Sequence, residues 1–256
     1  MVAATAPLIA PEDPLDPDVY NMKGGLSLIA PLGTDYQGRD LLSRVIYGTR
    51  ISIAVSILAI LLGTTTGSIW GVGTAYIGGK FDLIGQRFLE VIMAFPALIL
   101  AMILVSAMGP GFWVVVIAIA ATRVPYGCRV IRSVALAVKE NDYVLAARAI
   151  GASQLRIMVL HIAPQCIASY LVLATAHLGV AIVIEASLGF IGVGIPPPTA
   201  TWGNMLGGAV ASILIPHWPL VFWPGAAITI TVLAFNLFGD AIRDVLDPRL
   251  RGTASG

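Results

Sequence analysis

Charged side chains are scarce in this sequence. Only 11% of its 256 residues are Asp, Glu, Lys or Arg, whereas 57% are hydrophobic. A soluble globular domain carries about 25% charged residues, so this chain has too little charge to cover a water-facing surface. The scarcity predicts an integral membrane protein. We expect an all-α chain, because a span outside a closed barrel must be helical to satisfy its backbone in lipid.

Cysteine is also rare, and the motifs of nucleotide and metal sites are missing. Cys128 and Cys166 are too few for a disulfide framework, and we expect both to be buried thiols near cytoplasmic helix ends. No Gly-x-x-x-x-Gly-Lys-Ser/Thr sequence occurs, so no P-loop binds ATP here. The histidines, His161, His177 and His217, lack zinc-ligand spacing. We therefore expect no catalytic residues, no metal and no cofactor in this chain, and no nucleic-acid partner.

Long apolar runs dominate the chain instead. A membrane helix needs roughly 20 predominantly apolar residues. By this criterion the sequence predicts five spans, with a tight Gly-Pro-Gly hairpin at 109–111 between the second and third. Pro96 should kink the second span because it cannot donate a backbone hydrogen bond. The Gly- and Pro-rich region before the last span predicts a loop with a short half-helix near 205–215. The five spans are expected near residues 51–79, 88–108, 112–133, 165–190 and 218–239.

The distribution of basic residues sets the orientation. Cytoplasmic loops carry an excess of Lys and Arg, and the short loops 109–111 and 191–217 contain neither. The other connections and the C-terminal tail hold ten, so we expect these to be cytoplasmic. The ten are Lys80, Arg87, Arg129, Arg132, Lys139, Arg148, Arg156, Arg243, Arg249 and Arg251.

Because each span crosses the membrane once, counting back from these cytoplasmic loops puts residues 1–50 outside the membrane. This segment is polar, and its apolar start, Val2 to Ala10, is about half a membrane helix in length. We expect that a first span is truncated or missing, and that residues 1–50 combine its outer remnant with an external region. An external N-terminus that needs no preceding span is the alternative. The membrane domain is then 51–239, followed by a cytoplasmic tail over 240–256.

The cytoplasmic loop within 134–164 is a polar island of small residues between apolar segments. Asp142 is a suitable N-cap for a helix opening at Tyr143. Gly151 should end or bend that helix, and a second helix should run from about Ser153 toward Pro164. Loops of this length are uncommon unless functional, although an ordinary basic connector is the simpler alternative. The small residues that would let a partner backbone approach closely are Ala146, Ala147, Ala149 and Ala152.

This loop resembles the signature loop of ABC-importer permeases. The family pattern is Glu-Ala-Ala, three residues, Gly, and then an apolar-Leu-Pro ending. This chain has Leu145-Ala146-Ala147, three residues, Gly151, and then His161-Ile162-Ala163-Pro164. Leu145 replaces the Glu and Ala163 the Leu, so the docking surface remains but a salt bridge from position 145 does not. The resemblance implies an ATPase-coupling loop formed by Asp142, Tyr143, Ala146, Ala147, Arg148, Gly151, Ala152, Ser153 and Pro164.

Three further stretches are similar to the C-type permease of dipeptide, oligopeptide and nickel importers. They run from Leu32 to Ser52, from Glu185 to Gly203 and from Gly239 to Arg249. The resemblance covers about 31–250 and implies the transmembrane helix bundle of a type I ABC importer permease. The family's first transmembrane helix has no counterpart here.

The resemblance also implies a function. The chain would be the pore subunit of an ATP-driven importer in a prokaryotic cell membrane, translocating peptides. Its expected partners are a homologous second permease subunit, two ABC ATPase subunits that hold ATP and Mg, an external solute-binding protein and the lipid membrane. Nickel or another small solute is the alternative cargo. A self-contained secondary transporter or channel is the alternative class, but it needs ionisable groups near the midplane, and this chain offers few.

Ionisable residues at membrane depth are candidate functional groups. Glu185 near an outer helix end and Arg123 inside the third span are therefore candidates for the substrate path. Each also has a structural interpretation, because Glu185 can pack against a neighbour and Arg123 can snorkel toward water. Glu90 with Arg87 favours a structural pair at a helix start.

Overall fold

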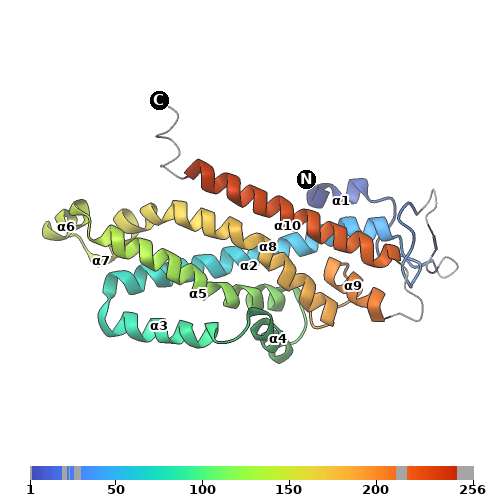
Figure 1. Cartoon of the computed structure of the whole chain (residues 1–256), viewed down its shortest axis with the longest axis horizontal. Coiled ribbons are helices and arrows are strands. Elements are labelled where there is room, and N and C mark those ends of the chain that lie inside the picture. The colour runs from blue at the N-terminus through green and yellow to red at the C-terminus, as the bar shows by residue number, and fades with distance from the viewer. Residues whose placement is uncertain (1, 19–21, 23, 26–29, 212–217, 247–256) are drawn as a thin grey trace.

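The computed structural model describes residues 2–18, 22, 24–25, 30–211 and 218–246. The regular elements of this part are helices, which confirms the predicted all-α class. Four helical stretches are long and apolar enough to cross a membrane, and they run side by side along the long axis (Figure 1). They are α2 (Leu41–Ile77), α5 (Phe112–Lys139), the stretch Gln154–Ile191 that includes α8 (Ile167–Ile191), and α10 (Trp218–Leu246).

A fifth span is broken. The helices α3 (Gly79–Met93) and α4 (Ala97–Met108) pass the same length and composition test only as a pair, and they meet at an angle of 89°. Pro96 is the residue before α4 and has no N–H to donate to the preceding turn. The predicted kink is confirmed, and in Figure 1 α4 turns across the bundle while α3 runs along it.

Several helix bounds differ from the prediction. α2 begins at Leu41 instead of 51, because the Asp40 carboxylate caps it through the N–H of Ser43 and the polar first turn is buried. α10 continues beyond 239 to Leu246. The half-helix, α9, occupies Trp202–Ala211 instead of 205–215. Residues 212–217 and 247–256, which include part of the predicted half-helix and of the tail, lie outside the described residues.

α2 and α5 pack with their backbones in direct contact. Gly63, Gly67 and Gly71 are spaced by four, so they lie on one face of α2. A Cβ atom at Gly67 would lie 2.3 Å from the carbonyl oxygen of Val124, and the other two glycines approach α5 nearly as closely. Small residues at such spacing are a common device for close helix association in membranes. This contact fixes the central helix pair of the bundle.

The end of the bundle where α2 begins is organised around a buried carboxylate. Asp35 accepts hydrogen bonds from Arg39 Nε at 2.7 Å and from the N–H of Gln37 at 2.7 Å. Arg44 Nε lies 3.4 Å from the same carboxylate, and Arg44 Nη1 donates to the Pro14 carbonyl at 3.0 Å. The network joins the loop before α2 to the segment that follows α1 (Val2–Ile9). It explains how two arginines are accommodated within buried structure.

α9 is held against α2 by one tryptophan. Trp202 is 1% exposed, and its Nε1–H donates to the Val45 carbonyl at 3.1 Å. Its backbone N–H points at the Ser52 hydroxyl at 3.4 Å. This short helix is therefore a docked part of the bundle.

We expect Trp202→Phe to destabilise the detergent-solubilised protein by about 1–2 kcal/mol, since it removes one buried hydrogen bond and part of a packed side chain, while the Val45 carbonyl keeps the Thr49 hydroxyl as a donor. Thermal unfolding followed by intrinsic fluorescence or by dye binding to buried thiols measures the change. Trp113→Phe is the matched control, because Trp113 is 65% exposed at the start of α5. Equal melting temperatures for the two variants would contradict the docking role of Trp202.

Candidate functional site

The coupling loop forms a short helix at the tip of the molecule. α6 (Asp142–Ala149) lies beyond the ends of the long helices, at the opposite end from α9 (Figure 1). Asn141, in an extended conformation, occupies the N-cap position without a side-chain hydrogen bond. The prediction of Asp142 as N-cap is therefore wrong by one residue. Asp142 is instead the first residue of α6, where a carboxylate is favourable near the helix N-terminus.

Gly151 ends α6, as predicted. Its φ of +81° is in the left-handed region that glycine adopts without a steric penalty. The N–H of Gly151 donates to the Arg148 carbonyl at 3.0 Å, and the N–H of Ala152 donates to the Ala147 carbonyl at 3.1 Å. These two bonds form a Schellman motif, which satisfies carbonyls at the helix end. Gly151 thereby sets the sharp turn between the two parts of the loop.

The second part of the loop is an irregular helix that leads into the membrane. Ser153 accepts a hydrogen bond from the N–H of Arg156 at 3.4 Å and caps α7 (Gln154–Ile157). A π-helical turn over Met158–Ile162 and a 3-10 turn over Ala163–Cys166 then precede α8. Pro164 lies in this break, because proline cannot donate to the preceding turn. Cys166, like Cys128, is a buried free thiol, as predicted.

α6 is anchored on the ends of α2 and α5 that lie next to it. Val144 is fully buried, and Ala147 is 8% exposed, in an apolar cluster with Tyr76 at the end of α2. The Arg148 guanidinium lies over the Tyr76 ring, 5.6 Å from its centroid. Next to this cluster, Lys139 at the end of α5 donates from Nζ to the last carbonyls of α2, at 3.1 Å for Ala75 and 3.0 Å for Tyr76, and so ties α5 to α2. α6 itself is attached to the bundle through Val144, Ala147 and Arg148.

Several large apolar side chains of this region are exposed. We call them the tip patch and define it as Tyr143, Leu145, Ile150 and Leu155, which are 44%, 43%, 86% and 69% exposed. They lie on more than one face of the loop, and apolar side chains exposed on a short polar segment are of the kind that bind another protein. Among the other predicted coupling residues, Ala147 and Ala152 are turned partly or wholly inward. Asp142, Ala146, Arg148, Gly151, Ser153 and Pro164 are exposed.

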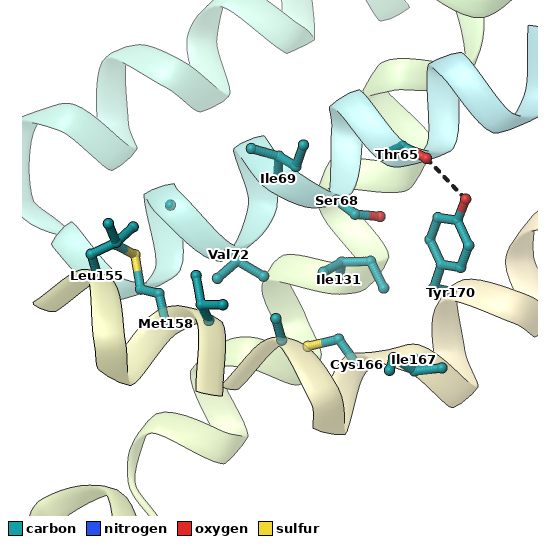
Figure 2. A pocket seen from close by; sticks show the side chains of 13 residues that line it. Thr65, Ser68, Ile69, Val72, Ile131, Leu155, Met158, Cys166, Ile167 and Tyr170 are labelled. Atoms are coloured by element: carbon teal, nitrogen blue, oxygen red, sulfur yellow. Dashed lines mark hydrogen bonds between the residues drawn. The ribbon is translucent and has the colours of Figure 1, made fainter. Parts of the chain in front are cut away.

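An apolar cavity of about 390 Å³ lies directly behind the coupling loop. Figure 2 shows its walls, formed by α2 on one side and by the irregular helix after Ser153 on the other. The hydroxyls of Thr65 and Tyr170 meet at 2.9 Å at one end of it. Its lining residues are Thr65, Ser68, Ile69, Val72, Gly73, Ile131, Leu155, Met158, Val159, Ala163, Cys166, Ile167 and Tyr170.

The two ionisable candidates for the substrate path lie in different places. Glu185 is 2% exposed, and its carboxyl faces the hydroxyls of Ser52 and Thr201 below α9. Arg123 is 5% exposed and packs against Gly63 of α2. Positions 52 and 63 of one helix are about 16 Å apart, so the structure does not bring Glu185 and Arg123 together. Their roles in a substrate path stay predictions.

α3 carries two ion pairs, one within the helix and one to α5. Arg87 and Glu90 form an exposed pair at 2.7 Å, which agrees with the structural interpretation of Glu90, although the pair lies near the end of α3 and not at a helix start. Arg132 of α5 binds the Asp82 carboxylate with two nitrogens, Nε to Oδ1 at 2.7 Å. Fifty residues separate Asp82 and Arg132, so no local spacing could reveal their contact.

The fold and the tip patch define a helical membrane permease. Residues 59–252 match the sequence model of the family described as "Binding-protein-dependent transport system inner membrane component". This is more than half of the chain, which therefore belongs to that family and is a multi-pass membrane protein. The family resemblance inferred from the motifs is confirmed.

Two named proteins are similar to this chain over most of its length. A putative peptide transport system permease protein of Brucella suis biovar 1 (strain 1330) is 43% identical over 219 residues, which is 86% of this chain and 73% of the relative. The glutathione transport system permease protein GsiD of Escherichia coli O1:K1 / APEC is 40% identical over 254 residues, 98% of this chain and 83% of the relative. Both carry the names of permease subunits.

Two solved structures share the fold. An inward-facing MetNI methionine ABC transporter matches with a TM-score of 0.63 at 17% identity, over 80% of this chain and 96% of that chain. An amino acid ABC transporter with histidines matches with a TM-score of 0.59 at 19% identity, over 79% and 94%. At such low identity the likeness concerns the fold alone, and it confirms the predicted class of bundle.

Proposed function

We propose that this chain is a pore subunit of an ATP-driven ABC importer in a prokaryotic cell membrane, and that its cargo is peptides delivered by an external binding protein. The observation that carries the proposal is the family match combined with the tip patch, a coupling surface of the kind that such a permease needs. The peptide and glutathione relatives support the cargo, since glutathione is itself a small peptide. A homologous second permease would complete the pore.

The tip patch is the proposed seat of one of two ATPase subunits. ATP and Mg bind those subunits and not this chain. When ATP binding closes the ATPase dimer, α6 is displaced with it. The contact of Arg148 with Tyr76 at the end of α2 supports the transfer of this displacement to the membrane helices. ATP can drive the change only through a difference in binding free energy between the inward- and outward-facing states.

The external end would receive the binding protein. The loop around Asp35 and the docked helix α9 form a rigid platform there, because their polar groups are bound internally. A rigid platform suits recognition of a partner that releases its cargo on docking, since less side-chain freedom is lost on binding.

Purification from native membranes in mild detergent tests the proposal. We expect ATPase subunits and a second permease to copurify, and the reconstituted complex with its binding protein to import labelled di- and tripeptides only when ATP is supplied. ATP-dependent uptake of Ni²⁺ but not of peptides would contradict the proposed peptide cargo. Uptake by this chain alone, driven by an ion gradient, would contradict its assignment as an ABC importer subunit.

A further inference from the structure

Arg123 lies close to the middle of the membrane. It is eleven residues from Phe112, the first residue of α5, and therefore about 16 Å from the outer helix end. The hydrocarbon core is about 30 Å thick. The residue is 5% exposed. A guanidinium at this depth is costly and generally marks a functional site.

The charge of Arg123 is not compensated within the described structure. Its Nε donates to the Thr122 hydroxyl at 3.0 Å, and its guanidinium lies over the Tyr126 ring at 5.0 Å. The ion pairs of the described residues use other arginines. Every acidic residue of the chain except Asp247 is described. The two terminal nitrogens of Arg123 therefore have no acceptor in the described part of the chain.

A second helix contributes to the same place. His177 of α8 contacts Tyr126 edge to face, with ring centroids 5.7 Å apart. Its Nδ1 is buried without a hydrogen-bond partner. Tyr126 itself is 40% exposed, so the cluster reaches the surface of this chain. Three groups able to donate hydrogen bonds thus share one location and lack a common acceptor.

We propose that Arg123, Tyr126 and His177 form a mid-membrane carboxylate site that holds a carboxylate of the cargo during translocation. A guanidinium presents two parallel N–H donors that match a carboxylate. The inference rests on the proposed function, because every peptide with a free C-terminus brings such a group. A carboxylate from the homologous permease is the other source of the same chemistry.

A separate groove lies next to the site, toward the cytoplasmic end. It has a volume of about 480 Å³ between α5, α8 and α10, and its walls include Val130 and Ala176. Val130 lies one turn from Tyr126, and Ala176 precedes His177. At the other end the groove is lined by Arg243. An anionic group that leaves Arg123 would therefore meet a second cation on its way inward.

Transport of matched peptides tests the site. Uptake is measured with the reconstituted complex and its binding protein. Each tripeptide with a free C-terminus is compared with its C-terminal amide, and only those tripeptides are used for which the wild type imports both forms. We expect Arg123→Gln to lower uptake of the free acid about tenfold, because a charge-assisted hydrogen bond is lost, and to leave the amide unchanged. Arg123→Lys should be intermediate, since Lys lacks the forked geometry. Arg129→Gln, an exposed arginine on the same helix, is the control.

The remaining outcomes overturn the inference. An unchanged acid-to-amide ratio in Arg123→Gln rules out recognition of the cargo carboxylate. If uptake of both peptides falls equally, and the second permease no longer copurifies with the complex in the absence of cargo, then the carboxylate that pairs with Arg123 belongs to that second subunit. If the wild type imports no peptide, the proposed function fails and the carboxylate site fails with it.

Discussion

Gly67→Leu is expected to prevent this chain from forming a stable bundle. A side chain at Gly67 meets the Val124 carbonyl oxygen at 2.3 Å and the Cys128 nitrogen at 2.8 Å. Backbone atoms cannot turn aside as a side chain can, so α2 and α5 must separate. We expect a loss of about 3 kcal/mol or more, the upper range for overpacked cores. The measurement is the yield of monodisperse protein by size-exclusion chromatography in detergent.

Gly73→Leu is the matched control on the same helix. A Cβ at Gly73 meets no atom within 4 Å. Both substitutions gain about 1 kcal/mol of helix propensity over glycine, so any difference between them reports packing. Equal yields of the two variants would show that α2 and α5 do not depend on this contact.

Ile150→Asp is expected to uncouple the transporter while the fold stays intact. Ile150 is 86% exposed in the tip patch, so the substitution removes no internal packing. It puts a charge where the proposed ATPase surface must bury an apolar side chain. Loss of a central interface residue costs about 2 kcal/mol or more, and we expect ATP-driven uptake to fall at least about tenfold. Uptake by reconstituted complexes and copurification of the ATPase are the measurements.

Two variants control for this effect. Ile150→Val keeps an apolar side chain and should keep most of the uptake. Leu15→Asp places the same charge on an exposed leucine in the segment after α1 and should leave ATPase copurification unchanged. Full uptake by Ile150→Asp would mean that the ATPase does not contact the tip patch.

The spans and the coupling loop were accessible from sequence because their signals are local. An apolar run of roughly 20 residues predicts a span whatever it packs against, and a glycine after a short helix predicts its end. The start of α2 was not accessible in this way. Arg44 looks like a residue outside the membrane, but Asp35 and the Pro14 carbonyl neutralise and bind it within the fold.

Other features depend on three-dimensional neighbours. The glycines at 63, 67 and 71 have a spacing of four that is visible in the sequence and is a signal for helix association, but the helix they pack against is visible only in the structure. Asn141 and Asp142 are both good N-caps, so the choice between them depends on where α5 ends. That Arg123 has no acidic partner among the described residues could be seen only from the positions of those residues in the structure.

The irregular helix between Ser153 and α8 has a mechanical consequence. An α-helix rises about 1.5 Å per residue and a 3-10 helix about 2.0 Å. Rewinding the four residues Ala163–Cys166 from 3-10 to α shortens that stretch by roughly 2 Å. The connection between α7 and α8 can therefore change its length by that amount without a break in either helix. The cavity lined by Leu155 and Met158 lies beside this connection and leaves room for its side chains to repack.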